Sequence, residues 1–457
     1  MRKRFKVVDR KTPMLFPPTV QELLSESHLA RFVVEILEQL DLRKFTDAYA
    51  GRGKDAYHPE VLIGIFVYGY ATGVYSSRAI ERGCRESLPF MFIAANTHPD
   101  HATISDFRKR FEGQIKDVFT QVLIVAARMG IAKLGTVSLD GSKINANASK
   151  HSALSFGHAE ELEKRLRVEV EELCRLAEKA ESQQLKLELD IPEELKRREE
   201  RLAAIREAKI EIEARAAERA AREKAEYDAR MAKRAAQRRE GKTPRGKDPE
   251  PPAEGPNSTD QVNLTDPESR IMPVSGGGFE QAYNAQIAVD ADSLLIVGCE
   301  VVQAVNDKQQ LEPMLRELAA LPESLGTPHT LLGDSGYFSE ANVKACAKAG
   351  IEPLLATGRE EHYHSLETLQ NKAEPLSADA DVDPLTRMKH DMKTGEGRKR
   401  YGRRKCTVEP VFGIIKQAMG FRQFMRRGLE RVRSEWQWVS LAWNIRRMAV
   451  LKAAMAV

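Results

Sequence analysis

Apolar positions recur at helical spacing along the first quarter of the chain. Between Leu29 and Leu40 they follow steps of three, four and one, which is typical of an amphipathic helix. Comparable patterns continue to about Ala132. They predict an all-α N-terminal domain, residues 1–132.

Two helices of this domain have features of DNA-binding proteins. One opens at Pro59 and breaks at Gly73, and the next is capped by Ser76 or Ser77, which is compatible with a helix-turn-helix. A later short helix, HATISDFRKRF, carries three consecutive cations that would reach phosphates: Arg108, Lys109 and Arg110. The solvated basic end of an ordinary helix would show the same pattern.

The twofold period of a strand first appears in GTVSLDGSKI. Val137 and Leu139 face one side of this strand and Asp140 faces the other. We expect Asp140 to end the strand just before a turn at Gly141. Residues 133–157 would then be the first part of a catalytic core.

A change of composition to Ala, Glu, Lys, Arg and Leu marks residues 158–239. Two apolar stripes with an Asp-Ile-Pro turn between them predict a long charged helical hairpin that interrupts the core. The hairpin would be either a peripheral solvated appendage or a contact between two copies of the protein. Residues 240–270 are rich in Pro, Gly and charge, which predicts a flexible linker.

Residues 271–457 return to core patterns. QAYNAQIAVD and SLLIVGCEVVQA predict an antiparallel strand pair followed by a helix. HTLLGDSGYF then predicts a buried strand ending at Asp334, followed by a helix and a short strand, IEPLLA. Residues 358–398 show no clear pattern. Two helices finish the chain: the first would open close to Thr407, with Pro410 in its first turn, and the second is striped with core tryptophans.

Charge and cysteine content narrow the class of protein. With 71 Lys and Arg against 67 Asp and Glu, the net charge is only +4, so the location of the charges matters more than their sum. The five cysteines are scattered without a CxxC pair, which argues against disulfides or a zinc site. No leader pattern and no membrane-spanning stretch is present, so we expect a cytoplasmic protein associated with the nucleoid.

Near the C-terminus, Glu409 is a lone acid among cations. Lys416 follows it by seven residues, which returns it to within about 20° of the same helix face. A carboxylate in such surroundings fits a metal ligand in an enzyme that acts on a polyanion such as DNA. Asp140 and Asp334, each at an expected strand end, could meet Glu409 at one sheet edge, although each acid alone would more often be a turn residue. The cations around Glu409 are Arg398, Lys399, Arg400, Arg403, Arg404, Lys405 and Lys416.

Four segments, TVSLDGSKINANASKH, GGFEQAYNAQIAVD, LLGDSGYFSEANV and RKCTVEPVFGIIK, resemble the DDE transposases of bacterial insertion sequences. The helical N-terminal domain is similar to that family's as well. The resemblance implies an α+β, mixed fold with a ribonuclease-H-like mixed-sheet catalytic core. It implies that Asp140, Asp334 and Glu409 are the catalytic acids and the ligands of two Mg²⁺ (or Mn²⁺) ions. The implied partner is DNA, as terminal inverted repeats and target, with a homodimer in the synaptic complex.

A large transposase group carries Tyr, two residues, Arg, three residues, Glu, six residues and Lys around the third acid. The Glu-to-Lys spacing fits this chain, and Tyr401 with Arg404 reproduces the Tyr-to-Arg spacing. One extra residue, however, separates Arg404 from Glu409. Either Lys405 and Gly402 take the Arg and Tyr positions, or a loop holds the extra residue.

Three functions remain open on the sequence alone. A transposase would cleave the element ends with water and then join the freed 3′-hydroxyl to target DNA. A nuclease or resolvase on the same core would cut without joining, and a non-catalytic protein would bind DNA as a scaffold. Lys416 would contact a phosphate or pair with Glu409, and Lys143 would touch DNA. Turn formation suffices to explain three further acids near strand ends: Asp290, Asp292 and Asp307.

Overall fold

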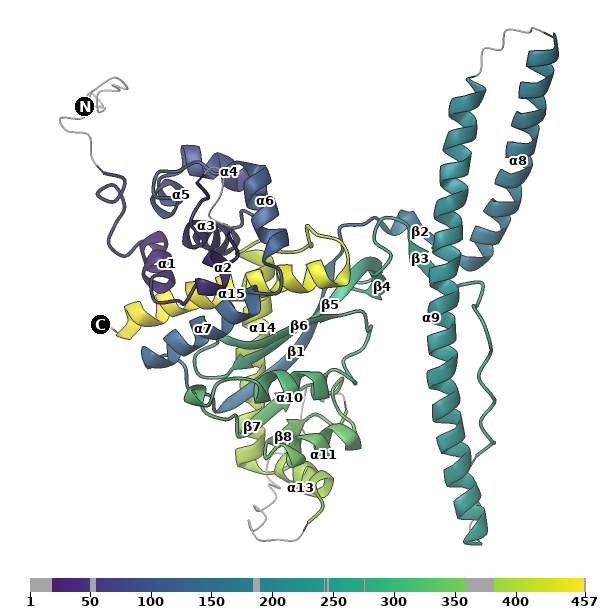
Figure 1. Cartoon of the computed structure of the whole chain (residues 1–457). Helices are drawn as coiled ribbons and strands as arrows, with labels where there is room; N and C mark the ends of the chain where they lie inside the picture. The colour runs from purple at the N-terminus through teal and green to yellow at the C-terminus, as the bar shows by residue number, and fades with distance from the viewer. Residues whose placement is uncertain are drawn as a thin grey trace, which may run out of the picture.

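The computed structural model describes residues 19–49, 55–183, 190–241, 243–244, 246–274, 276–358 and 382–455. They form a helical N-terminal part, a mixed sheet flanked by helices, and a long helical hairpin beside the core (Figure 1). The predicted α+β class with a ribonuclease-H-like sheet is therefore confirmed.

The N-terminal part is all helical, as its apolar spacing predicts. Its helix α3 ends before Gly73, whose φ of 83° favours glycine. The Ser76 side chain then accepts a hydrogen bond from the Ala79 N–H and caps α4. The helices are α1 (Leu29–Leu37), α2 (Arg43–Thr46), α3 (Pro59–Ala71), α4 (Ser77–Glu86), α5 (Leu88–Ile93), α6 (His101–Arg110) and α7 (Ile115–Arg128).

The central sheet has the strand order β4-β5-β1-β7-β8, and β6 also pairs with β5. Strand β5 is antiparallel to β1, β4 and β6, whereas β7 is parallel to both β1 and β8. The strands are β1 (Thr136–Asn145), β4 (Arg270–Pro273), β5 (Phe279–Asp290), β6 (Ile296–Val302), β7 (Thr330–Gly333) and β8 (Glu352–Leu355). The connecting segments include α10 (Leu311–Ala319), α11 (Glu340–Lys348) and α13 (Pro384–Asp391).

Strand β1 does not end at Asp140, which corrects the expectation from the sequence. It continues to Asn145, and Gly141 pairs with Gln286 of β5 instead of making a turn. A Cβ at residue 141 would lie 2.1 Å from Gln286 Nε2 and 2.5 Å from Asp307 Oδ1. Glycine is needed there because side chains approach the backbone closely, not because the chain reverses.

The last helix, α15 (Leu429–Met455), joins the helical part to the sheet. Trp438 packs 5.0 Å from the Phe66 ring of α3, measured between ring centroids. Trp436 Nε1 donates to the carbonyl oxygen of Gln286 in β5 at 3.1 Å, and Trp443 Nε1 donates to that of Leu294 at 2.9 Å. All three tryptophans are buried, so their predicted place in the core is confirmed.

Helix α14 (Gly395–Gln417) begins more than a turn before Thr407, and this too corrects the sequence-based expectation. The Thr394 side chain caps it by accepting the Gly397 N–H at 2.9 Å. Pro410 therefore lies inside the helix, where it cannot donate to the carbonyl of Cys406. Burial of the apolar face around it, which includes Val411, offsets that loss.

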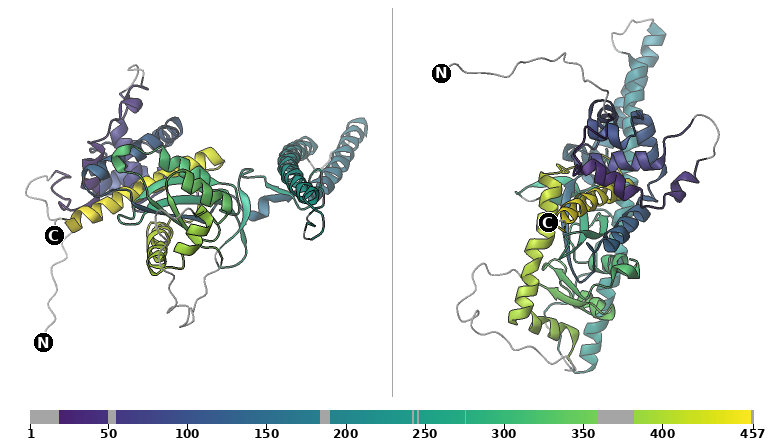
Figure 2. Two further views of the ribbon diagram at one scale, coloured as in Figure 1. Left: turned by 90° about the horizontal axis from the view of Figure 1, so that it is seen from below. Right: turned by 90° about the vertical axis from the view of Figure 1, so that its left-hand side faces the viewer.

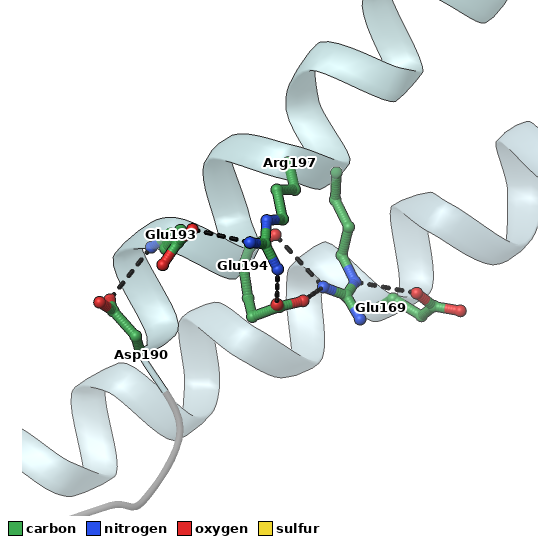
Figure 3. Close-up of polar contacts among 6 residues, drawn as sticks. Glu169, Asp190, Glu193, Glu194 and Arg197 are labelled. Atoms are coloured by element: carbon green, nitrogen blue, oxygen red, sulfur yellow. Dashed lines mark hydrogen bonds and ion pairs between the residues drawn. The ribbon is translucent and has the colours of Figure 1, made fainter.

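The charged segment forms the expected hairpin of α8 (Phe156–Gln183) and α9 (Ile191–Arg239). Leu166 and Ile205 belong to its buried seam, and Arg198 of α9 reaches Glu169 of α8 at 2.9 Å. Figure 3 shows Arg197 bridging Glu193 and Glu194 close to the start of α9.

The hairpin is attached to the core through a short strand pair. Strand β2 (Ala153–Ser155) is antiparallel to β3 (Gln261–Asn263) at its base, and the hairpin stands to one side of the core (Figure 2). The expected linker is partly structured: Asp248 pairs with Arg238 at 2.8 Å, and residues 261–270 enter β3 and the start of β4. None of the helices in the described ranges is both long and apolar enough to span a membrane.

Pro410→Ala is expected to stabilise the protein. Alanine restores an N–H donor for the Cys406 carbonyl and removes the ring clash, which should raise the free energy of unfolding by about 1–3 kcal/mol. Urea titration followed by circular dichroism would measure the change. Pro59→Ala is the control, because Pro59 is at the first position of α3 and no helical hydrogen bond is missing there. A Pro410→Ala protein no more stable than the wild type would contradict the expectation.

Candidate active site

Two predicted acids lie side by side at the centre of the sheet. In the parallel pair β1 and β7, Ser138 is opposite Leu332. Two residues further along, Asp140 is still in β1, and Asp334 directly follows the end of β7. Asp140 Oδ1 accepts the Gly141 N–H at 2.8 Å, and Asp334 Oδ1 accepts the Gly336 N–H at 2.8 Å. These bonds leave the other oxygen of each carboxylate available for a ligand.

The pKa of Asp140 is raised mainly by burial and further by neighbouring negative charge. Burial and the neighbouring charge of Asp334 raise this pKa from 3.8 to about 7, and the Arg404 guanidinium acts in the opposite direction. A raised pKa means that the ionised form of Asp140 is unfavourable in this environment. A bound cation would stabilise that ionised form.

Glu409 comes to the same region from α14, and Arg404 stands between it and Asp140. Arg404 Nη2 lies 3.2 Å from Glu409 Oε1, and Arg404 Nη1 lies 3.9 Å from Asp140 Oδ2. Within the part of the chain that the structure describes, no three acidic, His or Cys side chains are close enough together to hold a metal ion. The side chain of Glu409 is 51% exposed, so it has room to turn away from the arginine.

The chemistry of these donors nevertheless fits a hard divalent cation. Carboxylate oxygens are the ligands that Mg²⁺ and Mn²⁺ prefer. Asp140 and Asp334 have no carboxylate-neutralising cation at ion-pair distance other than Arg404, within the described residues. Glu409 could join them once its contact with Arg404 is exchanged for a metal.

Two lysines lie beside the acids: Lys416, which comes from α14 and contacts β1, and Lys143, which belongs to β1 itself. Lys416 Nζ donates to Ser142 Oγ and to the carbonyl oxygen of Lys143, at 2.5 and 3.1 Å. It therefore points toward β1, not toward Glu409, although both residues lie on α14. Lys143 Nζ is 3.8 Å from Asp307 Oδ1. Burial lowers the pKa of both lysines, while nearby carboxylates oppose that shift.

Helix α14 helps to decide which residues match the Tyr and Arg of the family pattern around Glu409: Tyr401 and Arg404, or Gly402 and Lys405. No loop interrupts the helix between Tyr401 and Glu409, so the extra residue is part of the helix. Arg404 contacts the acids, while Lys405 is exposed and Tyr401 packs in a small cluster with Leu332. The arginine that reaches the site is therefore Arg404.

Sequence reasoning missed Asp307 by treating it as a turn residue. Its Oδ1 accepts hydrogen bonds from Asn284 Nδ2 at 2.7 Å and Gln286 Nε2 at 2.6 Å. Its Oδ2 lies 3.7 Å from the place where a Cβ on Gly336 would be, and Asp334 Oδ1 lies 2.9 Å from the same place. The alternation of the two amides in β5 is the signal that could have placed Asp307 here, because both face one side of the sheet.

The basic end of α6 has partners within the protein. Arg108 donates to the Tyr70 hydroxyl at 3.1 Å, Lys109 pairs with Asp106 at 3.3 Å, and Arg110 donates to the carbonyl oxygen of Ala48. The expected phosphate contacts of Arg108, Lys109 and Arg110 stay predictions.

Asp140→Asn is expected to raise the melting temperature in a chelating buffer. The folded-state pKa of about 7 exceeds the ordinary 3.8, so the folded protein keeps a proton that the unfolded chain loses. Stability therefore falls as the pH rises between these values, and the loss is complete above about pH 7. The gain of the variant over wild type should grow from near zero at about pH 4 to a few degrees at about pH 8.

Thermal scans across this pH range would test the prediction. Asp228→Asn, which removes an exposed acid of α9, should give no such growth. A gain for Asp140→Asn that does not depend on pH would contradict the predicted pKa.

Asp307→Ala is expected to destabilise the protein by about 2–4 kcal/mol. It leaves two buried amides and a half-buried lysine without their shared acceptor, whereas a simple turn acid would cost little. Urea unfolding would measure the loss. Asp292→Ala, at an exposed turn position, is the matched control. If both variants lose the same small amount of stability, Asp307 is only a turn residue.

Two family models match parts of this chain. Residues 263–445 match the family described as Transposase DDE domain, and residues 18–110 match Transposase domain (DUF772). Asp334 and Glu409 lie inside the first match, and Asp140 lies outside both. Two proteins named probable transposase for insertion sequence element ISH11, from two strains of Halobacterium salinarum, are 27% identical over 149 residues.

That similarity covers 33% of this chain and 40% of each relative, so it spans less than half the length of either protein. No solved structure gave a significant match. The two family matches and the named relatives nevertheless all refer to transposases, and three of the four segments noted in the sequence lie inside the match at residues 263–445. The resemblance to DDE transposases of insertion sequences is therefore confirmed.

Proposed function

We propose that this protein is a DNA transposase that cleaves the ends of an insertion sequence and joins them to target DNA by metal-dependent phosphoryl transfer. The observation that carries the proposal is that Asp140 of β1 and Asp334, the residue after the neighbouring strand β7, lie close to each other, while Arg404 links Asp140 to Glu409 of α14. The match of residues 263–445 to a transposase DDE domain supports it. The names of the relatives support the same function.

Asp140, Asp334 and Glu409 would hold two Mg²⁺ or Mn²⁺ ions. When bound, such ions activate the attacking oxygen and stabilise the leaving oxygen of an in-line displacement. Arg404 would exchange its contact with Glu409 for one with a DNA phosphate, because a guanidinium pairs well with phosphate oxygens. Lys143 and Lys416 lie beside the acids and would contact the DNA backbone.

The reaction would proceed in two displacements at phosphorus. In the first, a water oxygen bonds to the phosphorus at the element end, the bond to the 3′-oxygen breaks, and that oxygen takes up a proton as the 3′-hydroxyl. In the second, this hydroxyl loses its proton and attacks a target phosphodiester, which releases a 3′-hydroxyl of the target. No covalent bond to the protein forms, so the residues serve to position the DNA and hold charge.

The two steps also separate this proposal from a nuclease or resolvase on the same core. A nuclease would carry out only the first displacement. A substrate that already ends in a free 3′-hydroxyl should therefore yield joined products with this protein, and failure to join it while nicking persists would favour the nuclease. A homodimer that brings two element ends together belongs to the same proposal.

Glu409→Gln is expected to reduce Mg²⁺-dependent nicking by at least about a hundredfold, because a metal ligand contributes several kcal/mol to such reactions. Binding to DNA that carries the inverted repeats flanking the gene should persist. Gel assays of nicking and of binding would measure the two effects separately. Glu430→Gln, at an exposed position of α15, is the control, and nicking retained by Glu409→Gln would remove Glu409 from the catalytic set.

A further inference from the structure

A cavity of about 650 Å³ lies between the hairpin helix α9 and the sheet edge formed by β4. It is lined by α9, by the β2–β3 pair, by the start of β4 and by residues 303–305 after β6. None of the proposed catalytic acids lines it. The hairpin packs on the β2–β3 pair through Leu154 and Val262, and the cavity lies beside this contact.

Four arginines line this cavity against two acids, Glu218 and Asp260. Arg215, Arg219 and Arg222 recur at intervals of four and three residues, so they share one face of α9. Arg219 is neutralised by Asp260 at 2.7 Å, and Arg215 lies 2.8 Å from Glu211. Arg222 is exposed and has no hydrogen-bond or ion-pair partner among the residues that the structure describes.

Arg270 faces the same cavity from β4 and also lacks a carboxylate partner within the described ranges. Its guanidinium donates to the carbonyl oxygens of Pro267, Glu268 and Ser269, at 3.1, 2.8 and 2.9 Å. Burial and the like charge of Arg215 lower its pKa to about 10. Two guanidiniums held this way are better stabilised when an anion enters the space between them.

The cavity is linked to Asp307, beside the proposed catalytic acids, by two hydrogen bonds. Ala304 lines it, and the carbonyl oxygen of Ala304 accepts a hydrogen bond from Asn284 Nδ2 at 3.0 Å. The same amide nitrogen donates to Asp307 Oδ1 at 2.7 Å. The cavity wall and the acidic site therefore share the buried side chain of Asn284 as a structural support.

We propose that this cavity binds the phosphodiester backbone of DNA, with Arg222 and Arg270 as the principal contacts. The seven residues from Arg215 to Arg222 span about 10 Å along α9, which is longer than a single phosphate and suits a run of backbone phosphates. The hairpin would thus hold DNA against the core at its base. This inference rests on the proposed function, because it requires that DNA is the substrate.

The salt dependence of DNA binding tests the assignment. Arg222→Ala in the full-length protein is expected to make the slope of log K against log salt shallower by about 1. Binding of a duplex unrelated to the element should weaken about tenfold near 0.1 M salt. Fluorescence anisotropy with a labelled duplex measures both quantities. Arg222→Lys should recover most of the affinity, since an ammonium also contacts phosphate.

Lys224→Ala is the matched control, because Lys224 is exposed on the opposite face of α9, two residues away, and its loss removes the same charge. It should change neither the slope nor the affinity. Melting temperatures should stay the same for both variants, since neither side chain has a hydrogen-bond or ion-pair partner within the described ranges. If Arg222→Ala and Lys224→Ala bind alike, the cavity does not hold DNA, even where the wild type cleaves normally. If the wild type binds no DNA, the proposed function fails instead.

Discussion

Burial of helix α15 is the constraint on which the rest of the molecule depends. Its tryptophans contact α3 on one side and β5 on the other, so neither the helical part nor the sheet has a complete core without it. Glu435 of the same helix is fully buried and accepts hydrogen bonds from the Tyr70 hydroxyl and from the N–H groups of Met425 and Arg426. The helical domain therefore has a fixed orientation toward the sheet.

Because the sheet and the helical domain are held rigidly together, several carboxylates can lie close to one another at the centre of the sheet. Asp140, Asp334 and Asp307 come from three separate segments, and burial together with the charges of Asp334 and Asp307 raises the pKa of Asp140. Arg404 offsets part of that increase without removing it. A site that is strained in this way binds a cation or a phosphate-bound metal more tightly than a relaxed site would, at a cost in stability that the large apolar core can bear.

The sequence predicted the strands, their acids and the tryptophan core because periodicity reports which faces are buried. The prediction from sequence was wrong where the usual preference of a residue, such as glycine for turns or proline for helix starts, is overridden by a tertiary contact. Gly141 reads as a turn, but the approach of Gln286 explains it, and Pro410 reads as a helix start, but the apolar face around Val411 carries the helix through. Asp307 was missed because its partners, Asn284 and Gln286, are more than twenty residues away in the chain.

The strand pair β2–β3, which attaches the hairpin to the core, has a consequence for how the hairpin could have entered this protein during evolution. Ser155 pairs with Gln261, so the chain leaves and re-enters the core at almost the same point, with more than a hundred residues in between. An insertion with adjacent ends adds little closure entropy and leaves the register of β1 and β5 undisturbed. The core could therefore have acquired, exchanged or lost such an arm as a unit, while its sheet and acids evolved separately.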